Sequence, residues 1–222
     1  MCLRDEGRFL PETKFTFKQL SLILSNLESF SVFNEYLEQY ETDSWVCSYI
    51  LFRALENGDI DFVVDLGIGS GRLGLGALLL GAKMVIGVDI DKKALFVAKR
   101  NYNYLKERFP EYIKGEFFLI NSDVKFFKVK SNVPLTVIMN PPFGLKRKGS
   151  DRIFLEKSFE ISDSVYTLLA ANSYPFVYRI SQENGFKVVH YELLDFNLPQ
   201  IYGHHRRSSY KMKVDFYILK KL

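Results

Sequence analysis

The sequence has few cysteines and no long hydrophobic run. Only Cys2 and Cys47 are present among its 222 residues, and neither belongs to a CxxC motif or a Cys/His cluster. This argues against a disulfide framework or a zinc site and predicts two free thiols in a reducing compartment. The sequence contains no run of about 18 apolar residues, so we expect no transmembrane helix. Acidic residues near the N-terminus, with no apolar run after them, argue against a secretory signal, and we expect a cytoplasmic protein.

Length and composition favour one compact globular unit with a short extension. Hydrophobic residues make up 47% of the chain, enough for a full core, and charged residues make up 25%. Leucines at loose helical spacing between residues 20 and 27 predict a helix that packs on a larger body. We therefore expect an N-terminal helical extension over residues 1–34 and the main domain over residues 35–222.

Strand and helix patterns alternate along the main domain. Such alternation with short loops predicts a parallel sheet covered by helices on both faces, which is an α/β fold. The last two strand patterns are separated by a loop that carries Pro199 and Gly203, so they are expected to pair antiparallel at one side of the sheet. The predicted strands are 62–66, 84–89, 116–120, 135–139, 165–170, 186–196 and 211–219. The predicted helices are 44–55, 72–80, 91–108, 151–163 and 174–183.

The most informative local motif is a glycine-rich turn between a predicted strand and a predicted helix, Asp65-Leu66-Gly67-Ile68-Gly69-Ser70-Gly71. Glycines in such a turn let a ligand approach the backbone closely. In open parallel sheets, ligands bind at the carboxyl ends of the strands. Asp89 ends the next predicted strand, where a carboxylate can accept hydrogen bonds from both hydroxyls of a ribose.

The same turn fits the dinucleotide pattern GxGxxG over residues 69–74, so NAD binding is a rival interpretation. Asp65 stands before the first glycine, where a pyrophosphate would meet its negative charge. A sulfonium-bearing amino-acid ligand such as S-adenosylmethionine (SAM) would instead gain a partner for its ammonium group. We favour a SAM-type site over a dinucleotide site and over a turn without a ligand.

A second motif, Asn140-Pro141-Pro142-Phe143, follows the fourth predicted strand on the same edge of the sheet. Its two prolines stiffen the loop and remove two amide donors. The Asn140 side-chain oxygen and the Pro141 carbonyl could accept the two hydrogens of an exocyclic amine, and Phe143 could stack on a flipped-out or single-stranded base. The alternative is a rigid loop with Phe143 in the core. Beside the glycine turn, the motif favours methyl transfer to an amine, driven by positioning rather than by a strong general base.

In this order the two motifs resemble those of amino-methylating class I methyltransferases, and most closely those of the METTL5-like small-subunit ribosomal RNA adenine-N6 methyltransferases. Residues 37–42, 138–144 and 195–206 match further segments of that family, and the resemblance runs from about residue 20 to residue 222. One departure is Ile68-Gly69-Ser70-Gly71, where the family often carries cysteines. The resemblance implies a Rossmann-like class I methyltransferase domain over residues 35–222. Its seven-stranded, mostly parallel sheet would have the order 3-2-1-4-5-7-6.

The resemblance also implies roles for individual residues. Asp65 and Gly67 would hold the amino-acid end of SAM, Asp89 the ribose and Asp123 the adenine. The implied cofactor-binding set is Gln39, Tyr40, Thr42, Asp65, Gly67, Gly69, Asp89, Ile90, Asp123 and Asn140. The implied catalytic set is Asn140, Pro141, Pro142 and Phe143. No metal ion is implied.

A small Trm112-like activator protein is implied as a partner. In the expected strand order the third strand is an edge, and an apolar edge strand invites a partner strand. The alternative is that the chain's own helices cover its aromatic residues. The strand would carry Phe117, Phe118, Leu119 and Ile120, with Phe126 and Phe127 just beyond.

Basic residues form three local clusters, and the net charge of +4 permits a nucleic-acid partner. One cluster follows the Asn-Pro-Pro-Phe turn, and another lies in the loop between the last two strands. Lysines and arginines there would contact RNA phosphates without reading sequence, although solvated surface lysines are the ordinary alternative. The first cluster is Lys125, Lys128 and Lys130. The two expected to bind RNA are Lys146, Arg147 and Lys148, and His204, His205, Arg206 and Arg207.

The sequence thus predicts SAM-dependent methyl transfer to N6 of an adenine in RNA, with small-subunit ribosomal RNA as the expected substrate. Similar Asn-Pro-Pro turns serve guanine-N2 methylation of RNA, adenine methylation of DNA and glutamine methylation of proteins, so these remain alternatives. Phe143 and the basic clusters favour nucleic acid, and there is no obvious separate DNA-recognition domain. A catalytically silent SAM-fold protein that binds assembling ribosomes is a rival of another class.

Overall fold

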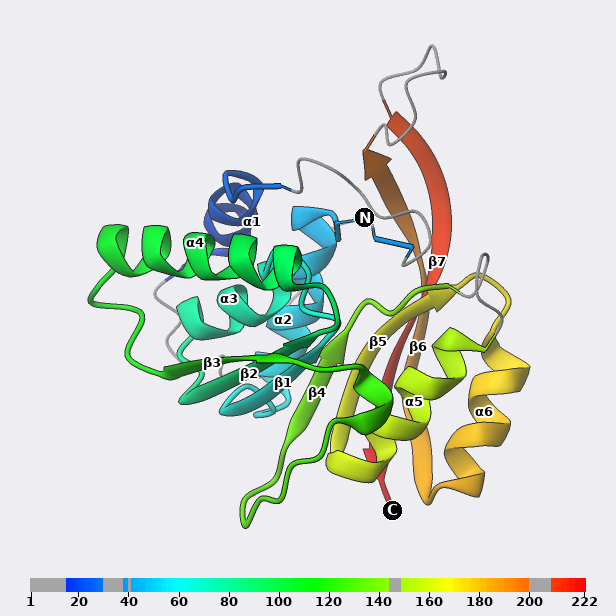
Figure 1. Ribbon diagram of the computed structural model, residues 1–222. Helices are drawn as coiled ribbons and strands as arrows, with labels where there is room; N and C mark the ends of the chain where they lie inside the picture. The colour runs from blue at the N-terminus through cyan, green and yellow to red at the C-terminus, as the bar shows by residue number, and fades with distance from the viewer. Residues whose placement is uncertain (1–14, 30–37, 40, 144–148, 200–208) are drawn as a thin grey trace.

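One seven-stranded mixed sheet forms the centre of the molecule (Figure 1). A computed structural model describes residues 15–29, 38–39, 41–143, 149–199 and 209–222. The strand order is β3-β2-β1-β4-β5-β7-β6, which confirms the order expected from the sequence. The strands are β1 (Phe62–Leu66), β2 (Met84–Asp89), β3 (Glu116–Asn121), β4 (Thr136–Met139), β5 (Ser164–Ala170), β6 (Phe186–Pro199) and β7 (Ser209–Lys221).

Strands β1 to β5 run parallel, and β7 pairs antiparallel with both β5 and β6. Strands β1, β4 and β5 are buried along almost their whole length and are mostly apolar, because helices cover both faces of the sheet. The expected antiparallel pair is confirmed, and both of its strands are longer than the sequence pattern predicted. Their extra residues carry the pair beyond the carboxyl edge of the parallel strands (Figure 1).

Helices cover both faces of the sheet, as expected. Helices α1 to α4 contribute to one core cluster, and α5 and α6 contribute to the other. Helix α1 ends at Ser25, two residues before the last leucine of the predicted segment, and Asn26 is its C-cap. Within the described residues no helix is long and apolar enough to cross a membrane. The helices are α1 (Phe17–Ser25), α2 (Ser44–Glu56), α3 (Arg72–Leu79), α4 (Lys92–Arg108), α5 (Ser150–Ile161) and α6 (Tyr174–Glu183), and a short 3-10 turn covers Val124–Phe126.

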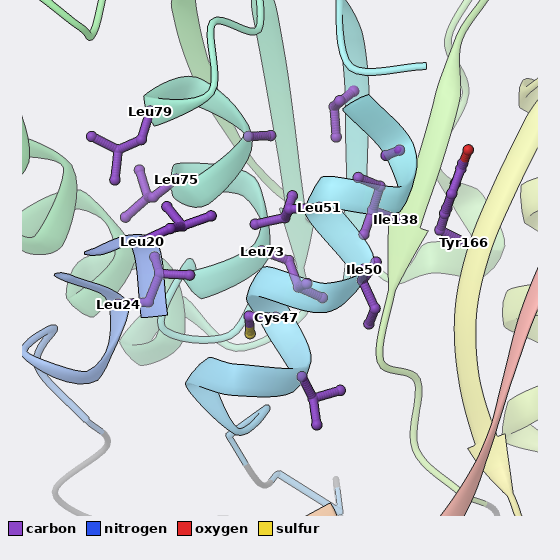
Figure 2. Packing of buried hydrophobic residues seen from close by; sticks show 14 of the residues in the cluster. Leu20, Leu24, Cys47, Ile50, Leu51, Leu73, Leu75, Leu79, Ile138 and Tyr166 are labelled. Carbon is purple, nitrogen blue, oxygen red and sulfur yellow. The ribbon is translucent and has the colours of Figure 1, made fainter. Parts of the chain in front are cut away.

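Helices α1, α2 and α3 pack tightly against one another (Figure 2). Leu20 and Leu24 of α1 and Leu51 of α2 are fully buried. A side chain at Gly76 of α3 would place its Cβ 2.4 Å from Leu51 Cδ1 and 3.3 Å from Leu24 Cδ1, so a larger residue would force Leu51 to shift. Helix α1 therefore shares the core of the main domain. The predicted division at residue 34 lies outside the described residues and stays a prediction.

Candidate cofactor and catalytic site

The glycine turn joins β1 to α3 at the carboxyl edge of the sheet. Gly67, Gly69 and Gly71 have φ angles of 74°, 57° and 93°, a region that side chains disfavour. The amides of Gly67 and Ile68 donate to the carbonyl of Val88 on β2, at 2.8 and 3.0 Å. A Cβ at Gly67 would also approach Phe154 to 3.1 Å. The turn is therefore held against β2 with its backbone open to a ligand.

Two buried carboxylates flank this turn. Asp65, at the end of β1, is 1% exposed, and its Oδ2 accepts from the amide of Gly74 at 2.8 Å. Burial raises the pKa of Asp65 to about 7, against the Gly74 hydrogen bond that lowers it, and the nearby charge of Asp89 adds to the rise. Asp89, at the end of β2, accepts from the amides of Gly69 and Asp91 at 3.0 and 2.9 Å, and burial raises its pKa too.

The segment that precedes α2 is attached to the glycine turn at its two described ends. On one side, Asn101 of α4 donates to the carbonyls of Glu28 and Ser70 at 3.0 and 2.8 Å. On the other, the guanidinium of Arg72 lies 2.8 Å from Glu41 Oε2 and donates to the carbonyl of Thr42 at 3.0 Å. Glu41 and Thr42 thus form one wall of the cavity in front of the turn.

Asn140 directly follows β4 and lies next to this wall. Its amide nitrogen donates to Thr42 Oγ1 at 3.0 Å, across 98 residues of sequence. Asn140 lines the cavity, and its side-chain oxygen is left as a buried acceptor without a partner among the described residues. Asp65, Gly67 and Gly69 line the same cavity, so the structure brings five of the predicted site residues together.

The cavity is polar and has unsatisfied groups. It has an empty volume of about 330 Å³, part of it open to solvent. Four buried atoms on its walls have no hydrogen-bond partner among the described residues: Glu41 Oε1, Asp65 Oδ1, Arg72 Nε and Asn140 Oδ1. Buried polar atoms without partners are rare in folded proteins because each costs about 1–3 kcal/mol. Acceptors beside a donor suit the ammonium and carboxylate of an amino-acid ligand, so the cavity fits that end of SAM.

Other predicted cofactor residues lie along the same edge, outside this cavity. The amide nitrogen of Gln39 donates to Asp91 Oδ2 at 2.9 Å. Ile90, directly after β2, is 49% exposed. Asp123 follows β3 and accepts from the amide of Lys125 at 2.9 Å, which caps the short 3-10 turn. These positions continue from Asp89 toward β3, in the direction expected for the ribose and adenine.

Phe143 lies where the core alternative expected it. Its ring is 6% exposed and belongs to the larger core cluster. Stacking of this ring on a base, as the sequence suggested, would require its surface to become uncovered. Tyr40 and the basic residues at 146–148 and 204–207 lie outside the described residues.

Five residues that line the cavity were not among the predicted site residues: Glu41, Ile68, Ser70, Arg72 and Leu73. Arg72 carried a usable signal. It is the first residue of α3, where a positive charge opposes the helix dipole, so some other interaction must hold it there. Its partner Glu41 is 31 positions away, and no local pattern links the two.

Comparisons with known proteins agree with this geometry. The family model of ribosomal protein L11 methyltransferase (PrmA) matches residues 41–131. An uncharacterised protein of Methanocaldococcus jannaschii is 33% identical, over 92% of this chain and 94% of its own length. The rRNA N(6)-adenosine-methyltransferase METTL5 of Danio rerio is 29% identical, over 90% and 96%. A solved structure of a candidate RNA methyltransferase from Pyrococcus horikoshii is 41% identical, with a TM-score of 0.82 over 94% and 98% of the two chains.

The strand order, the glycine turn with its two carboxylates and the polar cavity define a class I SAM-dependent methyltransferase. SAM is the cofactor of this class. Relatives that match nearly the whole chain place it more narrowly: it belongs to the METTL5-like family of methyltransferases.

Proposed function

We propose that this protein methylates N6 of an adenine in RNA, and that small-subunit ribosomal RNA is its substrate. The observation that carries the proposal is the fixed amide of Asn140. Thr42 holds its nitrogen at 3.0 Å, and its buried oxygen has no partner among the described residues. An exocyclic amine is a double donor that can satisfy such an acceptor. Relatives named as rRNA N(6)-adenosine methyltransferases support the choice of amine and substrate.

In the proposed assignment, Asp65 and the backbone at Gly67 and Gly69 hold the amino-acid end of the cofactor, and Asp89 holds the ribose. When bound, SAM supplies an electrophilic methyl group on a positively charged sulfur. Asp65 Oδ1 is buried and without a partner among the described residues, so an ammonium group would restore its missing interaction. Gln39, Ile90 and Asp123 extend the site toward β3.

Catalysis would consist mainly of positioning. Asn140 Oδ1 would accept one amine hydrogen and the Pro141 carbonyl the other, which directs the nitrogen lone pair at the methyl group. The new N–CH3 bond forms as the S–CH3 bond breaks, and the amine then loses a proton to solvent. Preorganised acceptors of this kind typically contribute about 10²–10³-fold to rate. A base inside a helix could not reach the cavity, so the adenine must be flipped out or unpaired.

The ribosomal protein methyltransferase model does not favour a protein substrate. Its match ends at residue 131, before Asn140 and the residues that would select the methyl acceptor. It therefore covers the cofactor-binding half of the domain, which class I enzymes with different substrates have in common. Cytoplasmic localisation stays a prediction.

We also propose that a Trm112-like protein pairs with the edge strand β3. Among the described strands β3 pairs only with β2, which leaves its outer side open. Phe118 and Ile120 are 48% and 37% exposed, whereas Phe117 packs on Tyr102 at 4.8 Å. Phe126 is 71% exposed just beyond the strand. A Phe118→Asp variant should therefore lose co-purification with the activator while it keeps its own fold.

The test of the methylation proposal is transfer of labelled methyl from SAM to small-subunit RNA from cells that lack this protein, followed by nucleoside analysis. We expect label in N6-methyladenosine, lost in Asn140→Ala and retained in Asn184→Ala. Asn184 is a suitable control because its amide caps α6 through the carbonyl of Ile180, away from the cavity. Label in N2-methylguanosine would keep the mechanism and reject adenine. No label, even with the activator present, would favour a different substrate or a non-catalytic binder.

A further inference from the structure

Glu41 and Arg72 form a buried ion pair in the wall of the cofactor cavity. The Arg72 guanidinium lies 2.8 Å from Glu41 Oε2. The Glu41 side chain is 3% exposed, and the Arg72 side chain is 14% exposed. Ser29 Oγ also donates to Glu41 Oε2. The other carboxylate oxygen, Oε1, and the Arg72 Nε–H have no partner among the described residues. Both residues line the cavity, and each has one buried polar atom that the pair itself does not satisfy.

A buried ion pair rarely stabilises a protein more than apolar residues of the same shape, because both charges lose their hydration. Such a pair with two unsatisfied atoms is costlier still. A ligand that completes the hydrogen bonds of the pair would offset this cost. An unpaired N–H donor and two unpaired carboxylate oxygens, Glu41 Oε1 and Asp65 Oδ1, belong to residues that line the same cavity, and together they complement a zwitterionic amino acid.

We propose that Arg72 binds the carboxylate, and Glu41 the ammonium, of the amino-acid end of SAM, with Asp65 as the second acceptor for the ammonium. This assignment rests on SAM as the cofactor and is independent of the RNA target. It gives the cavity two ligand-binding residues in addition to those that the glycine turn and Asn140 provide.

The same pair connects the cofactor to the catalytic amide. Arg72 donates to the carbonyl of Thr42 at 3.0 Å, and Thr42 Oγ1 accepts from Asn140 at 3.0 Å. A ligand that orders Arg72 therefore also orders the residue that orients Asn140. In this role Arg72 is a positioning residue for methyl transfer.

The test is calorimetric binding of three compounds to the full chain without RNA. S-adenosylhomocysteine carries both charged groups, its decarboxylated analogue lacks the carboxylate, and methylthioadenosine lacks the whole amino-acid end. Arg72→Lys keeps the positive charge but loses the planar donor fork. It should weaken S-adenosylhomocysteine about tenfold or more and leave the other two unchanged. Glu41→Gln should weaken binding of the two compounds that carry the ammonium group and leave binding of methylthioadenosine unchanged.

Two outcomes would overturn the proposal. Equal weakening of all three compounds would mean that the pair only supports the fold. Unchanged binding of S-adenosylhomocysteine in both variants would mean that the pair does not touch the ligand. Arg53→Lys is the matched control, since Arg53 pairs with Glu56 at 3.0 Å on the surface of α2, and it should change nothing. Arg72→Lys is preferred to alanine because an unpaired buried Glu41 could prevent folding.

The link to Asn140 is tested by a double-mutant cycle with Thr42→Val, measured as kcat at saturating SAM on whichever RNA the wild type methylates. If Arg72 acts through Thr42, Arg72→Lys should lower kcat in the wild type and cost little more in the Thr42→Val background. Additive losses would reject the coupling. If no RNA is methylated, the calorimetric test still decides the binding assignment, so its failure is separable from failure of the proposed function.

Discussion

Asp65 and Asp215 are both almost completely buried, at 1% and 0% exposure, and they have opposite surroundings. Asp215, on β7, accepts from the Ser173 amide at 2.8 Å, from the hydroxyls of Ser173 and Tyr217 at 3.0 Å, and from the Tyr191 hydroxyl at 3.2 Å. Asp65 accepts one hydrogen bond, from Gly74, and its second oxygen has no partner among the described residues. The fold uses both oxygens of Asp215, whereas one oxygen of Asp65 is available to a ligand.

The difference separates two uses of a buried charge. Asp215 ties the start of α6 to the antiparallel strands, so its removal should damage the fold. The buried, partly unsatisfied carboxylate of Asp65 destabilises the free protein, and ligand binding can restore that stability. Substitutions at each of the two sites test this difference.

The largest effect is expected for Asp65→Asn. The asparagine oxygen can still accept from Gly74, so the turn should persist, but the charge that faces the ammonium is gone. SAM affinity should fall by about 100-fold or more. The melting temperature of the free protein should stay the same or rise, because a buried charge is removed. Calorimetry and thermal unfolding check both, and a large loss of thermal stability would contradict the assignment.

Asp215→Asn should have the reverse profile. The new NH2 group would face donors that now point at a carboxylate, so unfolding free energy should fall by about 2–3 kcal/mol. Denaturant unfolding measures this change. Binding of S-adenosylhomocysteine, measured well below the melting temperature, should be unchanged; a parallel loss of affinity would show that Asp215 also serves the cavity.

The raised pKa of Asp65 predicts that cofactor binding depends on pH. In the free protein the carboxyl has a pKa of about 7, and an ammonium partner favours its ionised form. Below pH 7 binding must therefore release a proton, so affinity should rise about tenfold per pH unit up to 7 and then level off. Calorimetry in buffers of different ionisation enthalpy would count the proton. Asp65→Asn should remove this dependence, and a slope that persists in that variant would point to another group.

The smallest effect is expected for Tyr191→Phe. It removes the partner of Asp215 Oδ1 and leaves that carboxylate half-satisfied, as Asp65 is. The melting temperature should fall by less than in Asp215→Asn, because Tyr191 is 43% exposed and water can replace its hydroxyl. A fall as large as that of Asp215→Asn would indicate that the hydroxyl anchors the strand pair.

The sequence was sufficient to predict most of the sheet. Strands β1 and β2 have the predicted bounds because apolar runs end at Asp65-Leu66-Gly67 and at Asp89. It was less informative about β6 and β7, whose outer residues extend beyond the predicted apolar runs. Residues with a backbone signature, such as Gly67 and Asn140, were found at the site. The pairing of Arg72 with Glu41 was not, because it depends on tertiary contact rather than on local periodicity.

The start of α2 has a consequence for how the enzyme can be observed. Trp45 is the chain's only tryptophan, three residues after Thr42. It is 51% exposed, and its ring is nearly parallel to that of Tyr49, with ring centres 5.8 Å apart. Indole emission responds to solvent and to neighbouring aromatic rings, so a change in the wall near Thr42 alters the fluorescence. Stopped-flow recordings of the unlabelled protein can therefore reveal whether cofactor or RNA arrives first.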